Sequence, residues 1–135
     1  VAAPIAIPFQ AFYSATKSAT NALMFSLRNE VKPFGVKVCA VMPGDVKTGF
    51  TAARKKSLAG GDVYGSALEH AVAVMEHDEQ NGMPPSLVAK AIVHAANEKN
   101  PRALRTVGAQ YKIFVALAKF LPVRWTNALV GMIYK

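Results

Sequence analysis

The stretch NEVKPFGVKVCAVMPG at residues 29–44 decides the fold. A helical pattern precedes it and stops at PFG, residues 33–35, because proline cannot continue a helix and glycine readily ends one. The run VKVCAVM at 36–42 is rich in β-branched side chains, and the turn dipeptide PG follows it, as expected for a short buried strand. Helix, stop, strand and turn in this order form half of a βαβ unit, so the stretch predicts an α/β fold.

The remaining sequence predicts more helices and one more strand. Helices are expected at 11–32, at about 65–77, from Ser86 onward, and from Tyr111 onward with a break at Pro122. The serine hydroxyl is expected to cap the third of these helices. A second short strand is expected at ALRTVG, residues 103–108. Two parallel strands are too few for a stable domain, so we expect the chain to be a piece of a larger α/β protein.

Composition and charge narrow the class of protein. The chain is 52% hydrophobic and 18% charged, which is typical of a folded domain. Its single cysteine excludes an internal disulfide, and its histidines do not stand at metal-ligand spacing, so no metal site is expected. Residues 1–98 hold nine Lys/Arg and eight Asp/Glu, whereas residues 99–135 hold seven Lys/Arg and no acid. The net charge of +8 is therefore a property of the tail, and we expect no nucleic-acid partner.

Tyr13 and Lys17 form the candidate catalytic pair, within YSATK. They stand four residues apart, so their side chains share one helix face. A free phenol releases its proton only at about pH 10, and an ammonium group held nearby favours the phenolate. Such a pair can exchange a proton with an alcohol or a carbonyl oxygen. By itself the spacing is common, and an ordinary amphipathic helix is the simpler interpretation.

The order of the motifs along the chain favours a catalytic pair over an ordinary amphipathic helix. YSATK, the helix, the strand ending in PG, and DVKTGF together resemble the second half of a short-chain dehydrogenase/reductase of the classical type, most like its hydroxysteroid and retinol dehydrogenase members. The resemblance implies the C-terminal half of a Rossmann-like, doubly wound parallel sheet. Residues 1–110 would belong to that domain, whose N-terminal half is absent, and residues 111–135 would form an amphipathic, basic, helical tail.

The resemblance also implies roles for individual residues. Tyr13 would be the general acid/base, and Lys17 would assist it and bind the ribose of NAD or NADP. The other cofactor-binding positions would be Pro43, Gly44, Val46 and Thr48, with Val46 contacting the carboxamide through its backbone. The family's catalytic serine and its glycine-rich phosphate turn would lie upstream of Val1. We therefore expect this chain alone to be inactive, and the parent enzyme to be a homo-oligomer.

The expected reaction is the interconversion of an alcohol with a ketone or aldehyde on an apolar, lipid-, retinoid- or steroid-like substrate. Phe9 and Phe50 stand where the family builds its substrate pocket. The basic run RKK at 54–56 is expected to be a solvated loop surface. Two alternatives stay open: a non-catalytic dinucleotide-binding relative, and a module that binds membrane surfaces through its basic tail.

The tail itself combines an apolar stripe with basic and aromatic side chains. Residues 111–135 carry lysine and arginine beside this stripe, which suits peripheral contact with an anionic membrane surface. The charges inside the tail make a membrane span improbable. The competing interpretation is a C-terminal cap that packs on the substrate pocket or on a neighbouring subunit. We expect a cytoplasmic protein that associates with membranes through this segment.

Overall fold

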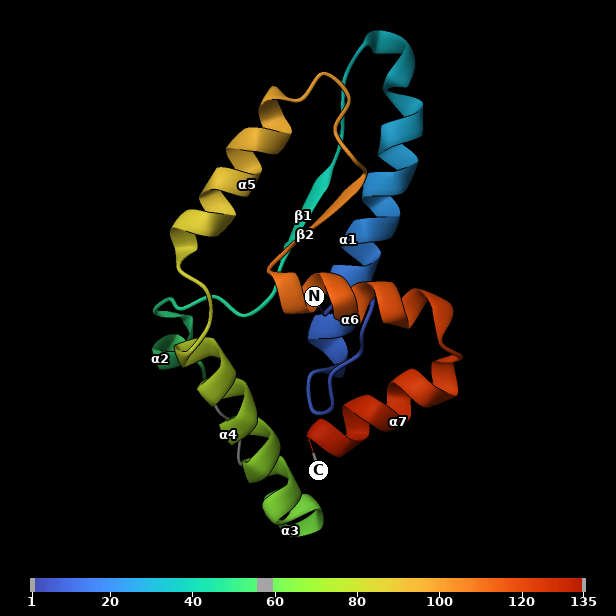
Figure 1. The fold of residues 1–135 in the computed structure, drawn as a ribbon. Helices are drawn as coiled ribbons and strands as arrows, with labels where there is room; N and C mark the ends of the chain where they lie inside the picture. Colours follow the sequence, from blue (N-terminus) through green and yellow to red (C-terminus); the bar gives the residue numbers. More distant parts are fainter. Residues whose placement is uncertain (1, 56–59, 135) are drawn as a thin grey trace.

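The fold is taken from a computed structural model that describes residues 2–55 and 60–134. These residues form a two-stranded sheet surrounded by helices (Figure 1). The strands are β1 (Ala40–Pro43) and β2 (Leu104–Val107). The helices are α1 (Ala11–Glu30), α2 (Phe50–Ala53), α3 (Gly61–Tyr64), α4 (Ser66–Gln80), α5 (Pro85–Asn97), α6 (Ala109–Phe120) and α7 (Val123–Ile133).

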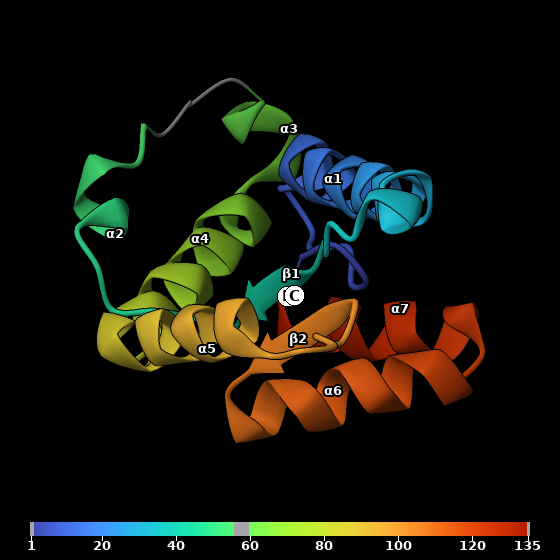
Figure 2. The same cartoon turned by 90° about the horizontal axis from the view of Figure 1, so that it is seen from above.

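The two strands pair in parallel, with Ala40 opposite Leu104 and Pro43 opposite Val107. Helix α1 lies on one side of the pair and α5 on the other (Figures 1 and 2). Helix α5 supplies the crossover between β1 and β2, which is the usual connection between parallel strands. The predicted α/β fold, with two parallel strands in a Rossmann-like arrangement, is confirmed.

Helix α1 ends close to where the sequence predicts. A single 3₁₀ turn over Lys32–Phe34 follows it, and Gly35 closes this turn with a φ of 73°, a left-handed value that glycine adopts without strain. The following strand was expected at 36–42, but the ladder covers only Ala40–Pro43. The guanidinium of Arg28 binds the carbonyl oxygens of Val38 and, at 2.9 Å, Pro101. The side chain of Arg28 thus links the two segments that lead into β1 and β2 before the hydrogen bonds between the strands begin.

Ser86 does not cap α5, and this prediction was wrong. The helix begins at Pro85 with Pro84 as its N-cap residue, so Ser86 already lies inside the first turn. Proline is favoured at the first helical position because it has no N–H group to satisfy there. The sequence also missed the short helices α2 and α3, and it ended α4 three residues before Gln80.

The buried core of the described residues is small. Its apolar members are Ala2, Met24, Met42, Ala71, Met75, Ala95 and Val115. Large apolar side chains on α1, α5, α6 and α7 remain exposed, Phe12 at 90% and Phe120 at 86% among them. Within residues 2–55 and 60–134, no helix combines the length and the apolar character needed to cross a membrane.

Candidate active site

Tyr13 and Lys17 continue the stripe of side chains through which α1 packs on β1. Asn21, one turn after Lys17, places its Nδ2 atom 3.6 Å from the sulfur of Met42 in β1. Met24 is buried, and Arg28 binds the carbonyl of Val38. The spacing of four, four, three and four residues keeps all these positions on one helix face. The pair therefore points to the side of α1 that faces the sheet.

The contacts between α1 and β1 determine where Tyr13 and Lys17 lie along the direction of the strand. Asn21 meets Met42 and Arg28 meets Val38, so the helix runs antiparallel to the strand. Helix rise of about 1.5 Å per residue moves Lys17 about 6 Å beyond Asn21. Two further strand residues of about 3.3 Å each bring the chain from Met42 to Gly44, at the same level. Lys17 and Tyr13 thus lie at the carboxyl end of β1, where open α/β sheets bind their ligands.

The pair is open to solvent, and the preceding loop binds the helix that carries it. The ammonium nitrogen of Lys17 lies 5.3 Å from the centre of the Tyr13 ring, and Tyr13 is 45% exposed. The Ser14 hydroxyl, which is buried, accepts a hydrogen bond from the N–H of Ile7 at 3.3 Å. Ser18 donates to the carbonyl of Ala3 at 2.6 Å. The loop before α1 is therefore bound to the helix beside the pair.

The turn after β1 presents backbone groups at this level. Val46 pairs with Met83 in parallel: the N–H of Met83 donates to the carbonyl of Asp45 at 2.9 Å, and the N–H of Lys47 donates to the carbonyl of Met83 at 3.0 Å. In parallel pairing of this kind, Met83 forms its backbone hydrogen bonds with the residues before and after Val46, and not with Val46 itself. The N–H and C=O groups of Val46 consequently point away from Met83. The Thr48 hydroxyl, which is exposed, accepts a hydrogen bond from the N–H of Phe50 at 3.2 Å.

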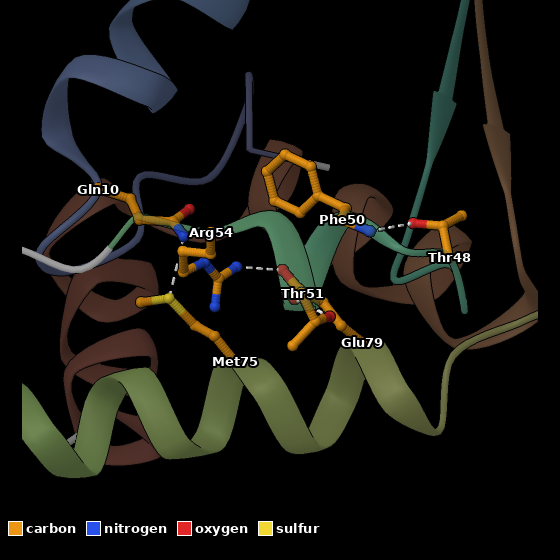
Figure 3. A network of polar contacts seen from close by, with 7 residues as sticks. All are labelled: Gln10, Thr48, Phe50, Thr51, Arg54, Met75 and Glu79. Carbon is orange, nitrogen blue, oxygen red and sulfur yellow. Dashed lines mark hydrogen bonds and ion pairs between the residues drawn. The ribbon is translucent and has the colours of Figure 1, made fainter.

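Helix α2 is fixed to the end of α4 by a polar network (Figure 3). Arg54 forms an ion pair with Glu79, and Thr51 donates a hydrogen bond to the other oxygen of Glu79 at 2.7 Å. The Arg54 side chain is only 13% exposed and lies over the Phe50 ring, 5.6 Å from its centre. The prediction of a solvated surface at 54–56 was wrong for Arg54, because Glu79 neutralises it in place. Lys56, in the same run, lies outside the described residues.

Phe9 lines an apolar groove that Phe50 does not reach. Its φ of 60° is rare for an aromatic residue and turns its ring onto Tyr64 in an edge-to-face contact of 5.4 Å. The groove has a volume of about 520 Å³ and is lined by Pro8, Phe9, Ala67, Ala128, Gly131, Met132 and Tyr134. Phe50 instead lies with Arg54, which is bound to Glu79 near the end of α4, while Gln10, next to Phe9, contacts Met75 one turn before Glu79.

A group of carboxyl and phenol side chains, which no sequence pattern predicted, comes from the turn, α4 and the tail. Tyr111 donates a hydrogen bond from its hydroxyl to Oδ2 of Asp45 at 2.6 Å. Burial raises the pKa of Tyr111, and the bond to Asp45 raises it further. Burial, with the charges of Asp45 and Asp78, raises the pKa of Tyr134 to about 12. Burial followed by the charge of Asp45 raises the pKa of Asp78. No periodicity or motif connects residues so far apart in the chain.

Comparisons with known proteins agree with the motifs. A family model described as short chain dehydrogenase matches residues 1–59. The 3-ketodihydrosphingosine reductase of Bacteroides thetaiotaomicron is 37% identical over 115 residues, which are 84% of this chain and 43% of that protein. A probable short-chain type dehydrogenase/reductase, VdlC, of Helicobacter pylori is 29% identical over 138 residues, 98% of this chain and 49% of that protein.

A steroid enzyme is also among the relatives. The mouse 17-beta-hydroxysteroid dehydrogenase type 6 is 29% identical over 140 residues, which are 92% of this chain and 43% of that enzyme. The chain thus spans less than half the length of these curated relatives. The matched segment at 1–59 contains the Tyr13–Lys17 pair, β1 and the turn after it. The chain belongs to the short-chain dehydrogenase/reductase family.

Proposed function

We propose that the protein carrying this chain is an NAD(P)-dependent oxidoreductase that interconverts an alcohol with a ketone or aldehyde on an apolar substrate. One observation carries the proposal: Tyr13 and Lys17 extend the packing stripe of α1 to the level of the turn after β1. A proton-exchanging pair and a set of free backbone groups then meet at one edge of the sheet. That juxtaposition suits a substrate oxygen beside a nicotinamide ring.

The residues of the turn fit the nicotinamide end of the nucleotide. A carboxamide needs one donor and one acceptor, and the N–H and C=O of Val46 point away from Met83. Thr48 offers an exposed hydroxyl, and Lys17 carries three N–H donors suited to ribose hydroxyls. We assign Pro43 and Gly44 to the floor of this site. When bound, the nucleotide supplies or accepts the hydride.

Tyr13 acts on the substrate oxygen in this scheme. Its phenol donates a proton to the oxygen of a carbonyl substrate and recovers it from an alcohol. The ammonium of Lys17 lies 5.3 Å from the centre of the Tyr13 ring, close enough to bind the cofactor ribose beside the phenol. Exposure of Tyr13 at 45% leaves room for a substrate to reach it.

An apolar substrate is supported by the groove at Phe9. Its volume of about 520 Å³ lies within the range of about 300–1,000 Å³ typical of small-molecule sites. Its residue Phe9 stands four positions before Tyr13 in the chain, and its side chains are apolar apart from the Tyr134 hydroxyl. We assign this groove to the hydrocarbon part of the substrate. Phe50 does not line this groove, so it would contact the substrate outside it.

The test is Tyr13→Phe in the full-length protein, assayed with NADH and NADPH against long-chain and steroid ketones. Loss of a general acid lowers kcat by about 10²- to 10⁴-fold, while nucleotide binding by calorimetry is retained. Tyr64→Phe is the matched control, because it removes a phenol oxygen from the same region without touching the pair. Unchanged turnover in Tyr13→Phe would exclude the assigned role. Nucleotide binding without turnover in the wild type would instead support the non-catalytic alternative.

We also propose that the α6–α7 region contacts an anionic membrane surface. Phe120 and Val123, on either side of the turn between these helices, are 86% and 74% exposed. Trp125 on α7 is 57% exposed, and Lys119 and Arg124 flank the turn. Residues 99–135 contain no acid that would oppose anionic lipid.

Liposome flotation tests this contact. Phe120→Glu with Val123→Glu should abolish flotation with phosphatidylserine vesicles, and salt should weaken flotation of the wild type. Val63→Glu is the matched control, since Val63 is equally exposed, at 77%, but lies on α3. Equal flotation of all variants would rule out this surface.

A further inference from the structure

Tyr111 connects the tail to the turn of the proposed site. It stands in the first turn of α6, and its hydroxyl donates to Oδ2 of Asp45 at 2.6 Å. Asp45 lies between Gly44 and Val46, the two turn residues assigned above to the nicotinamide end. A residue of the C-terminal tail therefore binds the centre of the turn directly.

The ring of Tyr111 also occupies the space beside two glycines. A Cβ atom on Gly44 would lie 2.0 Å from Cδ2 and from Cε2 of Tyr111, and one on Gly108 would lie 2.6 Å from Cδ2. Gly44 has no positive φ, so its backbone would accept alanine. The three nearest atoms to such a Cβ all belong to the Tyr111 ring, so the ring excludes a side chain at this position. Glycine at 44 has a reason inside the chain, independent of any bound nucleotide.

Three separate parts of the chain hold residues 44 and 45. The N–H of Gly44 donates to the carbonyl of Val107 in β2 at 3.3 Å, and the carbonyl of Asp45 accepts from the N–H of Met83 at 2.9 Å. These bonds fix the backbone. Tyr111 adds the contact to the Asp45 side chain and covers the glycine face. Val46 follows Asp45 directly in the chain. The orientation of the Val46 N–H and C=O groups therefore depends on how firmly Asp45 is held.

We propose that Tyr111 is a positioning residue, which holds Gly44 and Asp45 so that the Val46 backbone faces the nicotinamide end of the nucleotide. The inference rests on the proposed function. Tyr111 itself need not touch the nucleotide, because it acts through Asp45 from the tail side of the turn. The docking of α6 would thereby set the affinity of the site.

The first arm of the test measures stability and needs no activity. Gly44→Ala should lower the melting temperature by several degrees, because the new methyl group meets the Tyr111 ring. In a Tyr111→Ala background, the same Gly44→Ala change should cost nothing further. Equal losses in both backgrounds would show that the ring does not lie on Gly44, and would overturn the inference.

The second arm measures nucleotide binding to the full-length protein by calorimetry. Tyr111→Phe keeps the ring and removes the hydroxyl, so it should weaken NADH or NADPH binding about three- to tenfold, the effect of one hydrogen bond. Binding of ADP-ribose, which lacks the nicotinamide, should not change. Tyr64→Phe is the matched control, because it removes a phenol oxygen from α3, away from the turn after β1.

The outcomes separate the inference from the proposed function. If the wild type binds NADH or NADPH and Tyr111→Phe binds it equally well, Tyr111 has no positioning role and the inference fails alone. An equal loss for the dinucleotide and for ADP-ribose would likewise indicate general damage and overturn it. If the wild type binds neither NADH nor NADPH, the proposed function fails and the positioning role fails with it, while the stability arm still reports the packing.

Discussion

At the scale of single residues, the groove at Phe9 depends on an unfilled position in α7. Gly131 lies inside this helix, where glycine costs about 1 kcal/mol relative to alanine. A Cβ atom placed on it would meet nothing within 4 Å. The packing of the described residues thus gives no reason for glycine here. The groove gives one, because Gly131 is part of its lining.

Filling this position should change substrate binding without harming the fold. We predict that Gly131→Ala raises the free energy of unfolding by about 0.5 kcal/mol, because alanine favours the helix. Gly131→Leu should raise the KM for long-chain or steroid substrates several-fold and leave nucleotide binding unchanged. Asn127→Leu, which adds the same side chain to an exposed position of α7 outside the groove, is the control. An unchanged KM in Gly131→Leu would mean that the substrate lies elsewhere.

At the scale of elements, the attachment of α2 to α4 rests on one carboxylate. Glu79 binds both Arg54 and Thr51, and the Arg54 and Glu79 side chains are 13% and 16% exposed. Removing one member of a largely buried pair leaves the other charge uncompensated. We predict that Glu79→Gln lowers the free energy of unfolding by about 2–3 kcal/mol, measured by urea denaturation. Glu69→Gln, exposed on the same helix, should change it by less than about 0.5 kcal/mol. Similar values for both would show that the network adds no stability.

The same network shows where sequence reasoning stopped. The long helix, the PFG stop and the strand before PG follow from local patterns, so α1 and β1 were predictable within a few residues. The start of α5 was missed because proline took the first helical position and made a serine cap unnecessary. The role of Arg54 depends on Glu79, twenty-five residues away, and no local rule pairs them. Within the site, the Tyr13–Lys17 pair could be predicted from its spacing in the sequence. The hydrogen bond from Tyr111 to Asp45 could not.

At the scale of the whole molecule, Asp78 on α4 lies close enough to Asp45 in the turn and to Tyr134 in the tail for electrostatic interaction with both. Burial and the charge of Asp45 raise its pKa, while His77 opposes the rise. Asp78 is also in the last turn of α4, where the helix dipole disfavours a negative charge. The fold therefore favours the protonated form of Asp78 more than the unfolded chain does.

This preference has a defined pH dependence. A carboxyl group whose pKa is higher in the folded state stabilises the fold below its unfolded pKa, about 3.9, and this contribution is lost as pH rises through the folded pKa. We predict that Asp78→Asn raises the melting temperature at pH 7 and leaves it unchanged near pH 3, because asparagine resembles the protonated acid. Glu69→Gln makes the same change in net charge on the exposed surface of α4 and controls for the overall positive charge. If Asp78→Asn shifted the melting temperature equally at pH 3 and pH 7, the gain would come from packing, and the ionised carboxylate would not be what opposes the docking of the tail.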